Sequence, residues 1–457
     1  MQKNTIMPGS ADVIFGLQWG DEGKGKWVDY LSYSGNYDIV ARFQGGPNAG
    51  HTLYTPTGKK FITHQIPSGV FHKNIKLLCG SHVAINPIIL LNEIIGLQNL
   101  GYHVIDRLYI CQRSILITPF SVMQDKAEEI VSGKDVGSTQ NGIANSYKER
   151  KARTGLLMGD IFTMEDITTD SKYIQYRTDM VKYLNRMYLA DNLEIMEKED
   201  LTMEKIEAYE KEWLESIQTL KKMNLQVVDI QPIIFDCIGS GKNILAEGAQ
   251  GGMLDNTHGD YKYVTSSNTL PGEVSVSLGI PPQLIRNIYG VVKSYTTKVG
   301  GGPFPSKFAN EEMESAYQEM GAEKGATTGR LRNCGGFDMP VFRKFVQMSG
   351  VTHIIISKTD ICPFDLVEIV DHYFVNREKQ MFPPLHLSDV NGVERRYIKS
   401  WKGIRSGLQD ILPVPIELIN FASYLKNEAN IYSLLPDVKI YALGTGPEPN
   451  DCILYEE

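Results

Sequence analysis

A glycine-rich segment near the N-terminus has the composition of a phosphate-binding loop. It runs from Gly16 to Lys26 with the sequence Gly-Leu-Gln-Trp-Gly-Asp-Glu-Gly-Lys-Gly-Lys and follows an apolar run. Closely spaced glycines allow backbone N–H groups to converge on a phosphate, although the same glycines also suit a purely structural turn. Lys24 would reach the β- and γ-phosphates, whereas Gly25 replaces the Ser or Thr that binds magnesium in a standard P-loop. Asp21, inside the loop, is the carboxylate expected to hold the metal.

A second polar segment, Asn48-Ala49-Gly50-His51-Thr52, follows the next apolar run of the chain. Loops at the carboxyl ends of parallel strands gather at one edge of a sheet, so this segment is expected beside the glycine loop. His51 exchanges a proton near neutral pH. A single loop histidine is more often structural, so His51 gains weight only from its neighbours.

Together these two segments resemble the adenylosuccinate synthetase family, and the resemblance extends over nearly the whole chain. The glycine loop with an internal Asp, joined to the Asn-Ala-Gly-His-Thr segment, is a highly specific pattern. Further matching segments follow in the order of the family: Ile66–Gly69, Val136–Thr139, Ala152–Gly155, Glu247–Gly251, Val264–Asn268, Thr296–Pro305, Ala326–Arg332, Ser357–Asp360 and Gly444–Pro447.

The resemblance implies a ligase that joins L-aspartate to IMP with GTP and Mg²⁺, through a 6-phosphoryl-IMP intermediate. It implies that Asp21 is the general base at ring nitrogen 1 and a magnesium ligand, with the carbonyl of Gly50 as a second ligand. His51 corresponds to the acid that stabilises charge on oxygen 6. Gln250 corresponds to the residue that binds the hypoxanthine ring, and Lys24 completes the catalytic set.

The resemblance also implies three sets of ligand contacts. The GTP contacts are Gly20, Asp21, Glu22, Gly23, Lys24, Gly25, Lys26, Gly50, His51, Thr52, Arg332, Lys358, Thr359, Asp360, Gly444, Thr445 and Gly446. The IMP contacts are Asp21, Glu22, Gly23, Lys24, Asn48, Ala49, Gly50, His51, Thr139, Arg153, Gln250, Thr265, Val299 and Arg330. The aspartate contacts are Ala326, Thr327, Thr328, Gly329, Arg330, Leu331 and Arg332. Guanidinium groups suit the carboxylates of aspartate.

Two of these contacts carry specific expectations. The segment Ser357-Lys358-Thr359-Asp360 resembles the guanine-reading signature of GTP-binding proteins, in which the Asp carboxylate accepts hydrogen bonds from the guanine edge and the Lys stem covers the base. Arg153 resembles a family arginine that reaches the IMP of the other subunit, which implies a homodimer. Without the family match, Arg153 would be interpreted as a surface arginine.

The chain departs from the family pattern at three places. Gln140–Asn145 replaces a segment that usually carries an arginine near IMP, Pro47 replaces a histidine, and Gly444 stands where serine is common. The first change bears on nucleotide affinity and identity. Two alternatives therefore remain open: a related synthetase acting on another purine monophosphate such as dGMP, against which Asp21 argues, and a non-catalytic guanine-nucleotide-binding protein.

The sequence pattern around these residues predicts an α/β fold. Apolar β-type runs precede most of the polar segments, and we expect strands at Ala11–Gly16, Tyr37–Phe43, Lys76–Cys79, Asn243–Ala246, Ile288–Val292, Val351–Ser357 and Lys439–Leu443, with a helix at Gly25–Leu31. We predict a large, mostly parallel central sheet with a nucleotide site like that of P-loop NTPases. Residues 1–12 are expected to be an N-terminal extension and 13–457 a single domain.

A charged helical excursion is expected at about residues 160–225. Its clearest feature is an apolar stripe with helical spacing, made of Ile206, Tyr209, Trp213, Ile217 and Leu220. This pattern favours an amphipathic helix packed on the main body over a partner-binding helix.

Composition restricts the class of protein. The 457 residues include 46 basic and 54 acidic side chains, a net charge of −8 that does not favour binding to a nucleic-acid backbone. The six cysteines are scattered without a CxxC pair, which argues against zinc and a disulfide framework. The start of the chain lacks the pattern of a signal peptide, and the apolar runs are too short to span a bilayer. A cytoplasmic enzyme is the expectation.

Overall fold

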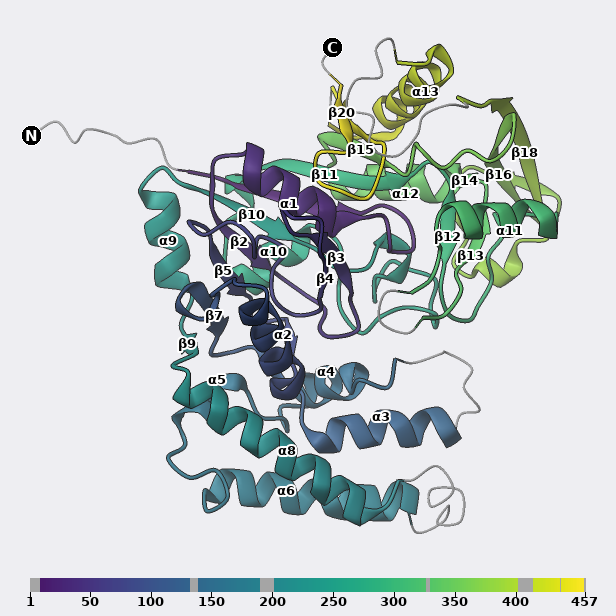
Figure 1. Ribbon diagram of the computed structural model, residues 1–457. Helices are drawn as coiled ribbons and strands as arrows, with labels where there is room; N and C mark the ends of the chain where they lie inside the picture. Colours follow the sequence, from purple (N-terminus) through teal and green to yellow (C-terminus); the bar gives the residue numbers. More distant parts are fainter. Residues whose placement is uncertain are drawn as a thin grey trace, which may run out of the picture.

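The computed structural model describes residues 9–131, 139–189, 201–325, 329–401, 414–435 and 437–455, and only the backbone of residues 188 and 189. The predicted fold class is confirmed: the chain forms a mixed α/β fold around a ten-stranded sheet (Figure 1). The strands of this sheet, in chain order, are β1 (Ala11–Gly16), β2 (Tyr37–Arg42), β5 (Lys76–Cys79), β7 (Leu108–Cys111), β9 (Gln226–Val228), β10 (Asn243–Glu247), β11 (Ile285–Lys293), β15 (His353–Ser357), β19 (Lys439–Gly444) and β20 (Cys452–Leu454).

Shorter strands and the helices surround this sheet. The other strands are β3 (His51–Tyr54), β4 (Lys60–Thr63), β6 (Ala84–Ile85), β8 (Ile115–Leu116), β12 (Thr296–Lys298), β13 (Asn333–Gly335), β14 (Phe337–Asp338), β16 (Leu366–Val375), β17 (Glu378–Gln380) and β18 (Gly392–Lys399). The α-helices are α1 (Lys24–Ser34), α2 (Pro87–Asn99), α3 (Pro119–Val131), α4 (Ile143–Ala152), α5 (Met158–Thr163), α6 (Ser171–Leu184), α8 (Met203–Lys222), α9 (Gln231–Gly239), α10 (Gly272–Leu278), α11 (Glu311–Met320), α12 (Met339–Ser349) and α13 (Ile416–Tyr432).

The order of strands in the main sheet explains how distant segments meet. The order is β20-β19-β15-β11-β1-β10-β2-β5-β7-β9, and all neighbours are parallel except β19 and β20. The loops that follow β1, β2, β10, β15 and β19 therefore leave the sheet at the same edge. The glycine loop, the segment with His51, the segment with Gln250, the guanine-reading segment and the glycines at 444 and 446 lie at or after the carboxyl ends of these five strands in turn.

Both faces of the sheet are covered, because successive side chains of a strand point to opposite faces. In β1, Ile14 belongs to a cluster that includes Trp27 of α1 and Leu90 of α2. Val13 belongs to a different cluster, with Ile234 of α9. Such double burial produces the near-continuous apolar runs by which these strands were predicted.

The helical excursion is present as predicted and lies below the sheet in Figure 1. Trp213 of α8 is fully buried, its indole nitrogen donates to the carbonyl of Ile117 at 2.9 Å, and Tyr173 of α6 stacks on its ring. Ile206, Ile217 and Leu220 are buried as well, whereas Tyr209 is partly buried. The stripe thus packs α8 on the body of the protein, in agreement with the prediction.

Several boundaries differ from the sequence expectations; β11, for example, begins at Ile285 rather than at Ile288. β1 begins at Ala11, so it contains Ala11 and Asp12 of the expected N-terminal extension. β15 begins at His353, two residues later than expected, because Gly350 ends α12 in a left-handed conformation and Val351 belongs to the connection. Among the helices of the described ranges, none has the length and apolarity required to cross a bilayer. All six cysteines are free thiols.

Candidate active site

The glycine loop between β1 and α1 is built around the buried carboxylate of Glu22. One carboxylate oxygen accepts the backbone N–H groups of Gln18 at 3.2 Å and Gly20 at 2.8 Å. Gly20 and Gly23 have φ near +86° and +88°, which side chains rarely adopt. A Cβ atom at Gly16 would lie 2.2 Å from the same carboxylate. Glu22, expected as a ligand contact, therefore also holds the loop in shape from inside.

Two lysines of α1 are tied to the surrounding loops. Lys24 is 3% exposed; its ammonium group lies 2.6 Å from Glu22 and also donates to the carbonyl of Gln250. Lys26 donates to the carbonyls of Gly446 and Asp451, both at 2.6 Å, and burial lowers its pKa to about 8. The Lys24 ammonium group is thus placed at the phosphate loop, whereas Lys26 connects α1 to the loop after β19.

His51 forms a buried pair with Glu247, the last residue of β10. Its Nδ1 lies 2.5 Å from the Glu247 carboxylate, which also accepts the N–H and the hydroxyl of Ser68 at 2.7 and 2.6 Å. Burial lowers the pKa of His51, although Glu247 opposes this shift. The pKa of Glu247 is lowered as well, since the contacts with His51 and with the cation of Arg42 outweigh burial. A neutral imidazole that donates from Nδ1 to an ionised carboxylate satisfies both shifts and leaves Nε2 as the reactive nitrogen.

The departure from the standard P-loop at Gly25 has a steric cause. A Cβ atom at Gly25 would lie 2.8 Å from the Cβ of His51. Real Cβ atoms do not approach this closely, so no Ser or Thr fits while His51 keeps its place. The segment with His51 thus occupies the space of the usual metal-binding hydroxyl, which agrees with the expectation that another group holds the metal.

Several polar atoms around the expected IMP pocket are buried without a partner in the described residues. They are both amide atoms of Gln250 and the side-chain oxygen of Asn48. The Asn48 amide donates to the Thr265 hydroxyl at 3.4 Å, which brings two expected IMP contacts together. Buried polar atoms are normally hydrogen-bonded. These unpartnered atoms are therefore consistent with a binding site for a polar ligand.

The remaining expected IMP contacts are less closely gathered. Arg153 ends α4 with φ of +64° and an exposed side chain, and Thr139 is exposed. Val299 follows β12 and is partly buried. Within the described residues, no hydrogen bond or ion pair joins these three side chains to the glycine loop. Their assignment to IMP stays a prediction, as does the effect of the changed segment Gln140–Asn145.

The expected aspartate-binding arm is partly described, because Ala326, Thr327 and Thr328 lie outside the described residues. Gly329, Arg330 and Leu331 are exposed. Arg332 contacts the glycine loop directly, since its Nε donates to Asp21 at 2.7 Å, while its Nη1 donates to the buried Glu323 at 2.7 Å. The arm and the expected catalytic base thus belong to one site.

The expected guanine pocket lies between the loops after β15 and β19. The N–H and the hydroxyl of Thr359 both donate to the carbonyl of Gly444 at 2.9 Å. One oxygen of Asp360 and the hydroxyl of Thr445 are buried without a partner in the described part of the chain. Burial raises the pKa of Asp360. An unpartnered buried carboxylate oxygen fits a missing donor such as the edge of a guanine ring.

The glycine at position 444 is explained by its neighbour Trp27. A Cβ atom at Gly444 would lie 3.0 Å from the indole ring of Trp27, whose nitrogen donates to the hydroxyl of Ser357 at 2.8 Å. This departure from the family's serine therefore accompanies a close contact between α1 and β19, and the backbone carbonyl of Gly444 keeps its role in holding Thr359.

Glu247, Ser68, Glu323 and Lys293 were not among the residues predicted from the sequence. Glu247 and Ser68 lie inside matching segments, and Glu247 directly precedes the loop with Gln250, so its position at a strand end was an available signal. Glu323 and Lys293 gave no such signal, because a charged residue in a turn or a strand normally lies in solvent.

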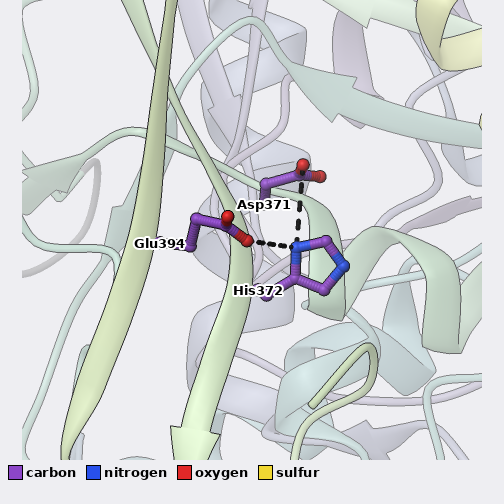
Figure 2. A group of neighbouring side chains, drawn as sticks. All are labelled: Asp371, His372 and Glu394. Carbon is purple, nitrogen blue, oxygen red and sulfur yellow. Dashed lines mark ion pairs between the residues drawn. The ribbon is translucent and has the colours of Figure 1, made fainter. Parts of the chain in front are cut away.

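A second group of possible metal ligands, Asp371, His372 and Glu394, lies on β16 and β18 (Figure 2). Each carboxylate already has a cation: Arg343 donates to Asp371 at 2.8 Å, and Lys379 lies 2.6 Å from Glu394. The group belongs to the four-stranded sheet of β14, β16, β17 and β18, outside the loops that form the candidate active site. Its contacts are those of an ion-pair network, and no metal role is assigned to it.

Comparison with known proteins agrees with this geometry. The family model of adenylosuccinate synthetase matches residues 13–453. The adenylosuccinate synthetase of Flavobacterium johnsoniae is 36% identical over 441 residues, which cover 95% of this chain and 98% of the relative.

Solved structures give the same result. Fully ligated adenylosuccinate synthetase from Plasmodium falciparum has a TM-score of 0.84 at 27% identity, covering 98% of this chain and 100% of the other. Succinoaminodeoxyadenylate synthetase of cyanophage S-2L, bound to dGMP and dATP, has a TM-score of 0.61 at 16% identity, covering 98% and 96%, and is similar in fold alone. The chain therefore belongs to the adenylosuccinate synthetase family and is a ligase of purine nucleotide biosynthesis.

Proposed function

We propose that the protein joins L-aspartate to IMP at the expense of GTP, giving adenylosuccinate, GDP and phosphate in the de novo and salvage routes to AMP. One observation carries this proposal. The glycine loop with Asp21, the pair of His51 and Glu247, and the unpartnered carboxylate oxygen of Asp360 follow parallel strands and meet at one edge of the sheet. These are the groups needed to bind a guanine nucleotide and to activate oxygen 6 of a purine.

The first step activates IMP, because oxygen 6 is otherwise a poor leaving group. Asp21 takes the proton from ring nitrogen 1 while oxygen 6 attacks the γ-phosphate of GTP, which yields 6-phosphoryl-IMP and GDP. His51, protonated when the anionic substrates are bound, donates a hydrogen bond from Nε2 to the charge that develops on oxygen 6 and the phosphate, and Glu247 stabilises this imidazolium at Nδ1. Lys24 neutralises phosphate charge at the loop.

The second step forms the new carbon–nitrogen bond. The amine of aspartate attacks carbon 6, the bond between carbon 6 and oxygen 6 breaks, and phosphate leaves with that oxygen and takes up the proton that the amine releases. The arm from Gly329 to Arg332 supplies guanidinium groups suited to the two carboxylates of aspartate. Gln250 holds the hypoxanthine ring with the amide atoms that are buried and unpartnered in the described residues.

The residues at the loop suit a magnesium ion. Asp21 is about 35% exposed on its side chain, and together with the carbonyl oxygen of Gly50 it offers the hard oxygen donors that Mg²⁺ prefers. When bound there, Mg²⁺ would offset negative charge on the phosphates of GTP. The position of the usual hydroxyl ligand is closed by the contact of Gly25 with His51.

A coupled assay tests the whole proposal. Purified protein with GTP and Mg²⁺ is expected to release phosphate only when IMP and aspartate are both present, with GDP and adenylosuccinate formed in equal amounts. Replacing IMP with dGMP tests a related synthetase. Binding of GTP without aspartate-dependent phosphate release would identify a non-catalytic nucleotide-binding protein and overturn the proposal.

We further propose that the enzyme is a cytoplasmic homodimer in which Arg153 contacts the IMP of the other subunit. The exposed left-handed end of α4 leaves the Arg153 side chain accessible to a partner. In a two-fold symmetric dimer, Arg153 of each subunit would reach the IMP site of the other in the same way.

A mixing experiment tests this arrangement. Arg153→Leu and Asp21→Ala homodimers should each be nearly inactive, whereas about a quarter of wild-type activity should return when exchanged subunits pair at random. Arg153→Leu protein taken alone through the same subunit exchange serves as the control, and it should stay nearly inactive. No recovery despite proven subunit exchange would place Arg153 outside the partner's site.

A further inference from the structure

Glu323 is a buried carboxylate to which none of the proposed ligand contacts gives a role. It is 0% exposed and lies in the turn after α11. Its two oxygens accept the ammonium group of Lys293, both at 3.0 Å, and one also accepts the hydroxyl of Tyr295. The other oxygen accepts Nη1 of Arg332 at 2.7 Å, and the Lys358 ammonium group lies 3.9 Å away. One carboxylate thus collects cations from three separate segments.

The charges of this cluster favour an ionised Glu323. Burial alone would raise the pKa of its carboxyl, but the cations of Lys293, Lys358 and Arg332 outweigh burial and lower it to about 2. With Asp21 included, the cluster contains two carboxylates and three cations. It therefore carries a surplus of positive charge in a site proposed to receive anionic substrates.

The backbone holds Glu323 and Arg332 beside each other. The N–H of Arg332 donates to the carbonyl of Glu323 at 3.0 Å, and Lys324 and Leu331 form an antiparallel bridge. Glu323 and Arg332 are therefore at the base of the arm whose outer residues, Gly329 and Arg330, are exposed. A change at the tip of the arm leaves this base in place.

The guanidinium of Arg332 spans two unequal carboxylates. Its Nη1 contacts the fully buried Glu323, and its Nε contacts Asp21, whose side chain is about 35% exposed. Ion pairs in contact with solvent are worth little, whereas breaking a buried pair is costly. The contact with Asp21 is thus the one that gives way first. Asp21 must also lose it before it accepts a proton from IMP.

We propose that Glu323 is a positioning residue that holds Nη1 of Arg332 while Nε passes from Asp21 to an anionic group of a substrate. The inference rests on the proposed function of the site. In the ligand-free protein the Arg332 side chain is paired with Asp21, the proposed base. When substrate arrives, the guanidinium group turns about its bond with Glu323, which frees Asp21 and directs Nε to the substrate anion. The fixed fork of arginine makes such a division between two partners possible.

The anionic group has the chemistry of a carboxylate or a phosphate, which aspartate and GTP both provide. Separate titrations of the two substrates distinguish these sources. If aspartate is the partner of Nε, loss of the Glu323 carboxylate raises the KM for aspartate; if GTP is the partner, it raises the KM for GTP. Either result supports the inference, and the KM for IMP is expected to change less than about threefold.

The test uses Glu323→Gln and the double variant Glu323→Gln/Lys293→Met in the full chain. The double variant removes both members of the buried pair of Glu323 and Lys293, so it keeps the net charge of the cluster unchanged if the single variant folds poorly. The matched control is Glu428→Gln, because Glu428 also accepts a buried arginine, Arg343, at 2.7 Å, outside the site. Thermal unfolding is measured for every variant, and KM and kcat are determined for each substrate.

We expect a rise of about 10- to 100-fold in the KM for aspartate or GTP, the range for one misplaced charge-assisted hydrogen bond. Glu428→Gln is expected to alter thermal stability without changing any KM. In an Arg332→Met background, the Glu323 change should have no further effect on KM, since both act through the same group. Unchanged KM values for both substrates, or an additive effect in the Arg332→Met background, would overturn the inference. Absence of wild-type activity would instead contradict the proposed function.

Discussion

Two carboxylates in the same site are paired in opposite ways. Glu247 and His51 are buried, 2.5 Å apart, and Ser68 holds the carboxylate with two further hydrogen bonds. Asp21 and Arg332 form a pair that is partly open to solvent, and Arg332 has a second partner. The first pair is preorganised, because both members are fixed by their surroundings. The second is exchangeable. Under the proposed function, the acid His51 is thus held in one place, whereas the base Asp21 is released when substrate binds.

The largest expected effect separates activity from stability. Asp21→Asn and His51→Asn should each reduce kcat by about 100- to 10,000-fold, the typical cost of losing a positioned acid or base. Their stabilities should differ. His51→Asn disturbs the buried Glu247 and should cost about 1–3 kcal/mol of unfolding free energy, whereas Asp21→Asn should cost at most about 1 kcal/mol. Chemical denaturation and steady-state kinetics of both variants check this. Equal stabilities would contradict the contrast between the two pairs.

A smaller effect is expected from Gly25→Ala, which acts on the fixed pair through packing. The added Cβ would lie 2.8 Å from the Cβ of His51, so the imidazole must move. Misplacement of a catalytic group by about 1 Å costs on the order of 100-fold in rate. The control is Gly239→Ala at the end of α9, where an added Cβ meets nothing within 4 Å. Wild-type rates for Gly25→Ala would mean that the position of His51 is not fixed.

Glu247→Gln should lower kcat by about 10- to 100-fold, the usual effect of replacing the partner that orients a functional histidine. Since Glu247 raises the pKa of His51, its loss should lower that pKa further, and because His51 acts in its protonated form, the alkaline limb of the pH–rate profile should shift to lower pH. A reduced rate with an unshifted profile would assign Glu247 a purely structural role.

The smallest effect concerns stability and pH. The pKa of His51 is lowered from the usual 6.5 in the folded protein, so the unfolded chain binds more protons near that pH. The stabilising contribution of neutral His51 is present above pH 6.5 and decreases as the pH falls, by at most about 1.4 kcal/mol for each pH unit. The difference in unfolding free energy between wild type and His51→Gln, measured at pH 7.5, 6.5 and 5.5, should therefore decrease. A constant difference would show that His51 is equally charged in both states.

The sequence was sufficient for the strands that end in the site, because parallel strands buried on both faces are continuously apolar. The ranges Ala11–Gly16 and Lys76–Cys79 were predicted without error. The loops with Asp21 and His51 could be placed at one edge from strand polarity alone. The partner of His51 could not be predicted in this way. Glu247 is 196 residues away from His51, and only the order of the strands brings β10 beside β2.

The cluster around Glu323 was beyond sequence analysis for a different reason. Lys293 and Glu323 read as ordinary surface charges in the sequence, yet they are 1% and 0% exposed on their side chains. Burial of a charge depends on partners from other elements, here Arg332 and Lys358, and neither hydrophobic periodicity nor a local motif encodes such a meeting. The expectation of a guanine pocket, in contrast, rests on four consecutive residues, Ser357–Asp360, taken together with the phosphate loop upstream.

The position of β1 in the sheet has a consequence for synthesis of the protein. This strand is the first to leave the ribosome, but both of its neighbours, β10 and β11, come more than two hundred residues later. At about 5–20 residues per second, roughly 10 to 50 s pass before β10 follows β1. During this interval an apolar strand with two unpaired edges is exposed in the nascent chain. Protection by a chaperone or by transient local contacts is therefore required more at the N-terminal segment than elsewhere.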